Sequence, residues 1–375
     1  MRLGVYWRSF ATLGGAPRVA MSIIDALEEL GHEPVVLTNE CDMQLYPTLL
    51  DEEIWCARKN LLSRSRVGKV VDAISATFLL TKRSGHLDGL FLTGMYFASA
   101  PMKIVSDTKI ILYVHAPVCV DWTLDPTLRK ISKKIEGKLY RSADYVLSNS
   151  KLTRNTLREH LKLDSEVLYP PVDTDFFSYS TKREANTIVS ICRLHPKKRS
   201  ELMIEYFKEL KGNNRFMLAG FLEDRFTEYR RRLMEIAAQD NRVSLLFNPN
   251  DEEIKDLYQS ATLFWYIYAK EEFGIPVAEA MSCGSPVVAF RGGGVSEIVA
   301  NNLTGFLVCS KEEFLERTAF LLNNPDVCRQ MGIAARKYVE NAFGCDTFAK
   351  RLQKILIHVF YGHNSELGFV GRDGC

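Results

Sequence analysis

The sequence lacks the patterns that mark metal sites, disulfide frameworks and membrane-spanning helices. Its nine cysteines form no C-x-x-C pair and its seven histidines no H-E-x-x-H motif, so spacing alone assembles no zinc site. No stretch reaches the roughly 18 to 20 apolar residues that a transmembrane helix needs, and the N-terminus has no long apolar signal-peptide core. We therefore expect reduced, mostly buried thiols in a soluble, cytoplasmic protein.

The composition is that of an ordinary globular protein with unevenly distributed charge. The 375 residues are 46% hydrophobic and 25% charged, a length that suits two domains better than one. The formal net charge of +2 hides two basic clusters in the first half. Residues 58–83 carry seven basic side chains against the single acid Asp72, and residues 129–141 carry six against Glu136.

Short apolar runs alternate with helix-period segments along the chain. Residues 3–7 and 33–38 read as strands around a helix at 19–30, which is a β-α-β rhythm typical of a parallel sheet covered on both faces. The stiff pair Pro170-Pro171 interrupts the rhythm. The sequence therefore predicts an α/β protein with two doubly wound parallel-sheet domains, 1–170 and 171–344, whose strand ends face a central cleft.

Two glutamates flank the start of a helix predicted in the second domain. Pro276 stands where this helix would begin and Gly284 just past its end, so Glu271 lies on the preceding loop and Glu279 on the first turns. Three backbone amides would be unpaired there, those of Phe273, Gly274 and Ile275. Such donors favour a phosphate. A solvated Glu271, with a Glu279 that only complements the helix dipole, is the alternative.

The segment around these glutamates resembles a known enzyme signature. The string E-x-F-G-x-x-x-x-E-A-M-x-x-G-x-P-V-V-A from Glu271, followed by GGGVSEIV, is similar to the donor-binding signature of GT4-like retaining glycosyltransferases. The resemblance implies the GT-B fold of two Rossmann-like domains. It assigns hydroxyls of the donor sugar to Glu271 and the nucleotide ribose to Glu279, roles that suit carboxylates as acceptors. It also implies that a C-terminal helix, about 345–361, packs back on the first domain.

A pair of cations upstream fits the same family. In ICRLHPKKR, Arg193 follows a strand and Lys198 comes five residues later, similar to the family's R-x-x-x-x-K pair, although Cys192 replaces the common glycine. Two fixed cations suit a leaving diphosphate, because each charge pair is worth about 4 kcal/mol at about 4 Å and an effective dielectric near 20. A metal would then be unnecessary. A solvated basic face over residues 197–199 is the alternative.

The first domain contributes two further candidates. Gly14 and Gly15 stand directly before a helix, where the backbone can approach a phosphate or a sugar. This loop resembles the family's glycine loop, with Pro17 in place of a frequent glutamate. His115 ends the strand KIILYVHAP, and the family has a histidine in this setting near the sugar's C6 hydroxyl. A histidine that only fills the core is the alternative.

A possible D-x-D metal motif, Asp173-Thr174-Asp175, follows YPPV at the domain junction. It resembles the family's YPPVD stretch at that point, so we expect no metal there. In this family no enzyme nucleophile is established. The resemblance implies that the leaving diphosphate takes the acceptor's proton on the same face of the sugar, with His115, Arg193, Lys198 and Glu271 around the reacting centre.

Donor and acceptor are expected from resemblance and charge. YPPVDTDFF resembles mannosyltransferases, which favours GDP-mannose, with UDP-glucose and other UDP sugars as the alternative. The basic clusters mix bases with apolar residues at helical spacing, which suits a polyprenyl-linked acceptor and peripheral contact with the anionic inner face of a membrane. Two solvated helices would give the same pattern. No nucleic-acid module is recognisable. A GT-B nucleotide-sugar isomerase, a phosphorylase-like enzyme and an inactive nucleotide-sugar-binding subunit are the competing functions.

Overall fold

The computed structural model describes residues 1–11, 14–56, 77–94, 99–117 and 126–362. These residues form two compact units. The first unit contains the described parts of Met1–Asn149, Thr153–Leu168 and the segment from Phe348, and the second contains Ser150–Leu152 and Tyr169–Thr347. The chain enters the main part of the second unit two residues before the expected junction.

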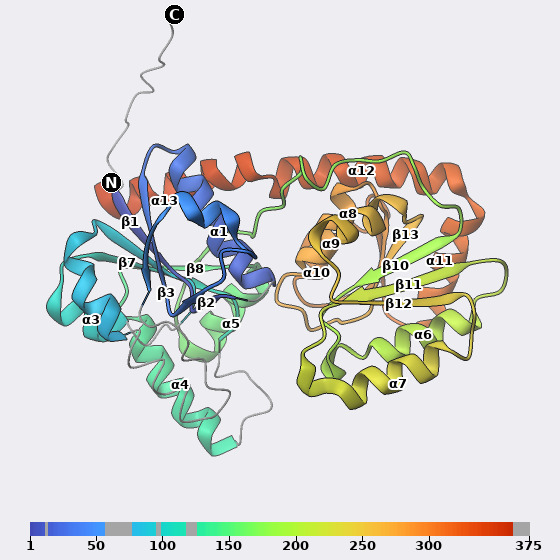
Figure 1. The fold of residues 1–375 in the computed structure, drawn as a ribbon, viewed down its shortest axis with the longest axis horizontal. Coiled ribbons are helices and arrows are strands. Elements are labelled where there is room, and N and C mark those ends of the chain that lie inside the picture. Colours follow the sequence, from blue (N-terminus) through green and yellow to red (C-terminus); the bar gives the residue numbers. More distant parts are fainter. Residues whose placement is uncertain (12–13, 57–76, 95–98, 118–125, 363–375) are drawn as a thin grey trace, which may run out of the picture. The chain divides into compact units, whose positions relative to one another are not determined.

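The first unit is built on a parallel sheet of seven strands in the order β5-β3-β1-β6-β7-β8-β9 (Figure 1). The strands are β1 (Arg2–Tyr6), β3 (Glu33–Thr38), β5 (Glu53–Cys56), β6 (Gly89–Leu92), β7 (Lys109–Val114), β8 (Tyr145–Ser148) and β9 (Glu166–Val167). The central strands are almost wholly buried apolar runs, as a parallel sheet covered on both faces requires. Two short strands, β2 (Ser9–Phe10) and β4 (Glu40–Cys41), pair separately.

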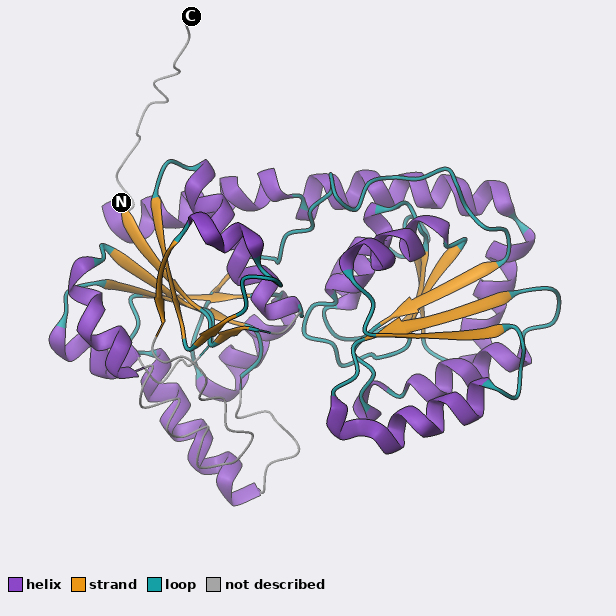
Figure 2. Cartoon of the chain, in the orientation of Figure 1, coloured by secondary structure: helices purple, strands orange, loops and turns teal. Residues whose placement is uncertain are grey.

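Helices cover this sheet on both faces (Figure 2). They are α1 (Gly15–Glu29), α3 (Ser99–Val105), α4 (Pro126–Tyr140), α5 (Lys151–Leu161) and α13 (Cys345–Tyr361), with residues 77–83 also helical. The last helix returns to this unit, where the His358 ring centroid lies 5.3 Å from that of Tyr145. A Cβ on Gly89 would meet the Phe360 ring at 2.5 Å, so this glycine allows α13 to pack closely.

The second unit is built on a parallel sheet of six strands in the order β12-β11-β10-β13-β14-β15. The strands are β10 (Thr187–Ile191), β11 (Arg215–Gly220), β12 (Val243–Phe247), β13 (Leu263–Tyr266), β14 (Val287–Phe290) and β15 (Gly305–Val308). Counted along the chain this is the Rossmann order 3-2-1-4-5-6, whose topological switch point lies between the first and fourth strands. Here those strands are β10 and β13, so ligands are expected beyond their carboxyl ends.

The helices of the second unit bury an apolar core, mostly aliphatic with several aromatic rings, against the sheet. They are α6 (Ser200–Glu209), α7 (Thr227–Ala237), α8 (Asp251–Ser260), α9 (Ile275–Ser282), α10 (Val295–Ile298), α11 (Lys311–Asn323) and α12 (Pro325–Phe343). Trp265 on β13 is fully buried, with its ring centroid 4.8 Å from Phe314 and 5.4 Å from Phe216. Its indole N–H donates to Thr318 Oγ1 at 2.9 Å, which satisfies the buried polar atom.

The predicted fold class is confirmed: both units are parallel-sheet α/β domains. The C-terminal helix expected at about 345–361 is α13, and extended Gly344 separates it from α12, where the Phe343 carbonyl accepts the N–H of Val172 at 2.8 Å. Two other points differ from the sequence analysis. Helices α5 and α11 were not predicted, since the polar sequence of α5 buries only three side chains. The thiols are not mostly buried where described, since Cys56, Cys309 and Cys345 at element ends are exposed.

Within the ranges that the structure describes, no helix is long and apolar enough to cross a membrane. The first basic cluster falls largely in residues 57–76, outside the described residues.

Candidate donor site

Two of the predicted cations follow the carboxyl end of β10. Arg193 comes two residues after the strand and is exposed, and Lys198 ends a short 3₁₀ helix, Pro196–Lys198. His195 caps this turn, its Nδ1 accepting the Lys197 N–H at 3.0 Å. The turn brings Lys198 back toward the sheet edge while Lys197 stays exposed.

Lys198 and Glu271 form an ion pair between the segments that follow β10 and β13. Their side chains are 19% and 18% exposed, so the pair is partly withdrawn from water but reachable by a ligand. Lys198 Nζ also lies 4.0 Å from the ring centroid of Tyr268. The Tyr266 hydroxyl donates to the same carboxylate oxygen of Glu271, Oε2, that Lys198 contacts. Burial and the nearby Glu271 charge raise the pKa of Tyr266 well above its usual range, so its hydroxyl remains a donor.

The Glu271 loop rests on the glycine run at residues 292–294. The Gly294 N–H donates to the Glu271 carbonyl at 2.7 Å. Gly293 adopts a φ of 56°, and a Cβ there would meet the Glu271 carbonyl oxygen at 2.4 Å. Only a residue without a side chain lets the two loops approach this closely, so the run GGG fixes the backbone that carries Glu271.

The start of α9 leaves backbone donors available. Gly274 is its N-cap with a φ of 108°, and Pro276 occupies the first turn, as predicted. Among the described residues, no acceptor contacts the amides of Phe273, Gly274 or Ile275. The Phe273 side chain points inward at 3% exposure, its ring centroid 5.7 Å from that of Tyr169 and 5.5 Å from that of Phe343. Any contact with a ligand would therefore use its backbone.

Glu279 lies on α9 as predicted, but it is only 4% exposed. Its carboxylate accepts the Tyr258 hydroxyl at 2.9 Å. A buried carboxylate needs such donors. A ribose that contacts Glu279 would therefore have to reach a buried carboxylate that is already hydrogen-bonded to Tyr258.

Cys192 lies at the base of the site, where the resemblance leads one to expect glycine. It is 6% exposed, its Sγ is 3.6 Å from Ser200 Oγ, and burial raises the pKa of the thiol to about 11. The thiol therefore stays protonated and acts as a small apolar side chain. The glycine that lets two backbone segments approach closely here is Gly220, because a Cβ on it would meet the Cys192 carbonyl oxygen at 1.7 Å.

The first unit places its candidates at the carboxyl ends of its own strands. Gly14 is the N-cap of α1 and Gly15 its first residue, as the glycine loop predicted. His115 directly follows β7, half-buried, with ring centroids 6.0 Å from Trp7 and 5.1 Å from Tyr113. Desolvation lowers the pKa of His115 to about 4, so the imidazole is neutral at physiological pH.

Asp173 holds the turn of its own segment together through hydrogen bonds to the backbone. Its Oδ1 accepts the N–H groups of Asp175 at 3.1 Å and Phe176 at 2.9 Å, which closes the turn after Pro171. Among the described residues, no group of three or more His, Cys, Asp or Glu side chains is arranged to hold a metal ion.

The sequence reasoning missed both tyrosines of the site. Tyr266 and Tyr268 belong to the run ATLFWYIY, whose apolar composition predicts only a strand. A signal was present, since period-2 alternation places both on one face at the strand end that leads into Glu271.

The comparisons with known proteins fit this fold. A model described as "Glycosyltransferase Family 4" matches residues 13–176, and one described as "Glycosyl transferases group 1" matches 171–338. The alpha-1,3/1,6-mannosyltransferase ALG2 of Rhizomucor pusillus is 25% identical, with 92% of this chain and 90% of that protein covered. A human GDP-Man:Man(3)GlcNAc(2)-PP-Dol alpha-1,2-mannosyltransferase is 28% identical over 50% of this chain and 43% of its own length.

Among solved structures, Anabaena HepE in complex with UDP and glucose superposes with a TM-score of 0.80 at 17% identity, covering 95% of this chain and 99% of that one. The two Rossmann-like units have the GT-B fold, and both matching family models define the protein as a glycosyltransferase. More particularly, since the two family models together span residues 13–338, the chain belongs to the GT4-like glycosyltransferases, with mannosyltransferases among its relatives.

Proposed function

We propose that this enzyme transfers a hexose, with mannose favoured, from a nucleotide-diphosphate sugar to a lipid-linked or glycan acceptor, with retention and without a metal ion. The observation that carries the proposal is the Lys198–Glu271 pair at the switch point of the second unit. It sets a cation suited to a diphosphate beside an acid suited to sugar hydroxyls. Exposed Arg193 adds a second positive charge on the same loop.

In the proposed reaction, the bond between the sugar C1 and the leaving phosphate oxygen breaks, and a bond from C1 to the acceptor oxygen forms on the same face. The acceptor proton passes to an oxygen of the departing diphosphate. Arg193, Lys198 and the amides at the start of α9 would neutralise the charge that develops there. Glu279 would hold the ribose. His115 and the Gly14-Gly15 loop are the proposed sugar and phosphate contacts of the first unit.

The donor can be tested by thermal unfolding with GDP, UDP and ADP sugars. We favour GDP-mannose because the name of a human relative includes GDP-Man. UDP sugars are the alternative, because HepE was solved with UDP. Ligand at about 100 times Kd stabilises the folded state by about 2.7 kcal/mol. Stabilisation by UDP sugars alone would replace GDP-mannose by a UDP sugar, and no stabilisation by any sugar nucleotide would refute the proposed function.

Three further measurements complete this test. Binding should be unchanged in EDTA, and loss that Mg²⁺ restores would refute the metal-free mechanism. NMR of the product should show the anomeric configuration of the donor. Binding without transfer or donor hydrolysis would favour the nucleotide-sugar-binding subunit, and conversion of the donor without an acceptor would favour an isomerase.

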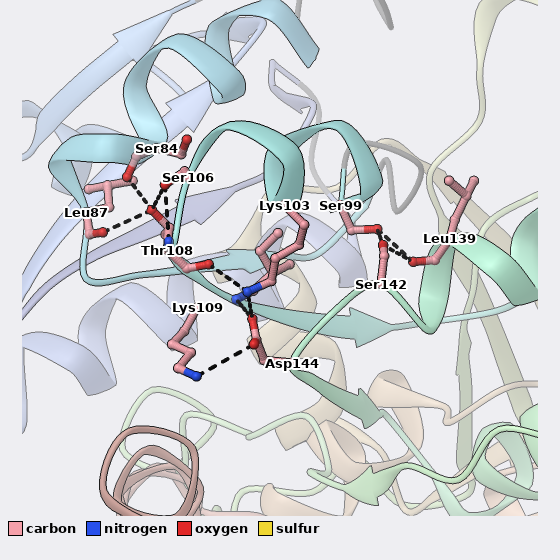
Figure 3. Close-up of polar contacts among 11 residues, drawn as sticks. Ser84, Leu87, Ser99, Lys103, Ser106, Thr108, Lys109, Leu139, Ser142 and Asp144 are labelled. Atoms are coloured by element: carbon pink, nitrogen blue, oxygen red, sulfur yellow. Dashed lines mark hydrogen bonds and ion pairs between the residues drawn. The ribbon is translucent and has the colours of Figure 1, made fainter.

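For the acceptor, we propose that the surface around α3 contacts an anionic membrane. A polar network fixes α3 on the unit (Figure 3). Ser99 Oγ donates to the Leu139 carbonyl at 2.8 Å, and Lys103 pairs with Asp144 at 2.5 Å. At the end of this fixed helix, Ile104 and Val105 are 84% and 58% exposed.

Helix 77–83 supplies the neighbouring surface. The Thr108 hydroxyl, which follows α3, donates to the Ser84 carbonyl at 2.5 Å and so ties the two segments together (Figure 3). On this helix Phe78 is 69% exposed, and Lys82 and Arg83 are exposed. Exposed apolar side chains beside bases suit a lipid headgroup region. Helix α4 adds exposed Lys133, Lys134 and Lys138 from the second basic cluster.

Vesicle flotation tests this surface. Wild type should float with vesicles of phosphatidylcholine and phosphatidylserine more than with phosphatidylcholine alone. The double variant Ile104→Ser/Val105→Ser should lose most of this binding. Ile333→Ser, which changes a side chain 51% exposed on α12 of the second unit, is the matched control. Equal flotation with both vesicle types, or an unaffected double variant, would contradict the proposal.

A further inference from the structure

We propose that Tyr266 is a positioning residue that orients Glu271 toward the donor sugar. This inference rests on the proposed function and adds a residue to it. Tyr266 ends β13, in register with Ala289 of β14, and is 4% exposed. Its position is therefore set by the sheet, whereas Glu271 lies on a loop.

The two oxygens of Glu271 have different surroundings. Oε2 accepts hydrogen bonds from both Tyr266 and Lys198. Among the described residues, no donor contacts Oε1, although the side chain is 18% exposed. The tyrosine and the lysine together thus turn one oxygen inward and leave the other for a hydroxyl of the ligand.

A bound diphosphate would compete with Glu271 for Lys198, because its negative charge attracts the ammonium group. When Lys198 moves toward the phosphate, its hydrogen bond to Oε2 is lost. The hydrogen bond from Tyr266 to this oxygen then remains. Its phenol is neutral, so the donor charge does not compete for it. Tyr266 would therefore keep Oε1 directed at the sugar in the loaded enzyme, when the orientation matters.

The nucleotide and the sugar nucleotide should respond differently to loss of this hydroxyl. In Tyr266→Phe the ring still fills the core and Lys198 is unchanged, so the lysine can still contact the phosphates. The Kd of the sugar nucleotide should rise about tenfold, equivalent to about 1.4 kcal/mol, while the Kd of the nucleotide diphosphate alone stays unchanged. A purely structural role would weaken both ligands together.

The matched control is Tyr145→Phe. Tyr145 begins β8, and its hydroxyl contacts the Glu166 carboxylate, so the substitution removes the same kind of bond at the amino end of a strand, not at a carboxyl end. It should change neither Kd. Should Tyr266→Phe unfold below the assay temperature, Glu271→Asp tests the same geometry, because the shorter acid cannot keep its contact with Tyr266.

The experiment is calorimetric titration of the full chain with GDP and GDP-mannose, or with the pair that stabilises wild type. If wild type binds no sugar nucleotide, the proposed function fails. If wild type binds and Tyr266→Phe either matches Tyr145→Phe or loses both ligands equally, the positioning role alone is overturned. Retained sugar affinity in Glu271→Asp would overturn it as well.

Discussion

Replacing Lys198 by methionine tests the core of the proposed site, because methionine keeps most of the apolar stem and removes the ammonium group. In the structure this group pairs with Glu271 and lies 4.0 Å from the ring centroid of Tyr268. The variant leaves Glu271 with its bond from Tyr266, so the acid is not stranded without a donor. We therefore expect a folded protein with a disabled diphosphate site.

The magnitudes follow from exposure and charge. With about one fifth of each side chain exposed, the pair lies between surface pairs, worth about 0 to 1 kcal/mol, and buried pairs, whose disruption costs about 3 to 5 kcal/mol. A loss of about 1 to 2 kcal/mol corresponds to roughly 2 to 8 °C in Tm for a unit of this size. Loss of one fixed partner for the developing charge should lower kcat by about 10² to 10³.

The assay is initial-rate transfer, or donor hydrolysis where no acceptor is at hand, with the melting temperature recorded in parallel. Lys311→Met is the control, because Lys311 pairs with Glu209 at 2.5 Å and lies 5.4 Å from the ring centroid of Tyr206. That pair joins α11 to α6 and is more exposed, at 35% and 50%. A Lys198→Met enzyme whose kcat stays within about threefold of this control would refute the reasoning.

Two other predictions concern the glycine run and His115. Gly293→Ala should abolish donor binding and destabilise the protein by more than Gly31→Ala. Both glycines have positive φ, but of the two only at Gly293 would an added Cβ meet backbone atoms within 4 Å. Equal melting temperatures and retained binding would contradict this prediction. The pKa of His115 in the folded protein, about 4, is below its value in the unfolded chain. The unfolded state therefore binds more protons between about pH 6.5 and 4. The free energy of unfolding falls as the pH is lowered through that window, by at most about 1.4 kcal/mol per pH unit. His115→Asn should flatten this part of the Tm-versus-pH curve relative to wild type, and parallel curves would refute it.

Much of the fold could be predicted because its strands are buried on both faces and read as continuous apolar runs. β7 and β13 are such runs, and the helix start at Gly274 and Pro276 has the local chemistry of an N-terminus. Helix α5 was not predicted because its sequence is mostly polar and it buries only three side chains. The start of the last helix at about residue 345 was predicted, but the hydrogen bond that accompanies the break before it, from the Val172 N–H to the Phe343 carbonyl, joins residues 171 positions apart and could not be.

The sequence by itself determined the two-domain α/β plan and the residue types of the donor site, because strand periodicity, helix caps and the E-x-F-G signature are local properties of the chain. Only the tertiary structure decided how these residues meet. It paired Lys198 with Glu271 across 73 positions, placed Tyr266 on the same carboxylate oxygen, and buried Glu279 against Tyr258. Those contacts depend on the order in which the strands lie side by side, which no local pattern encodes.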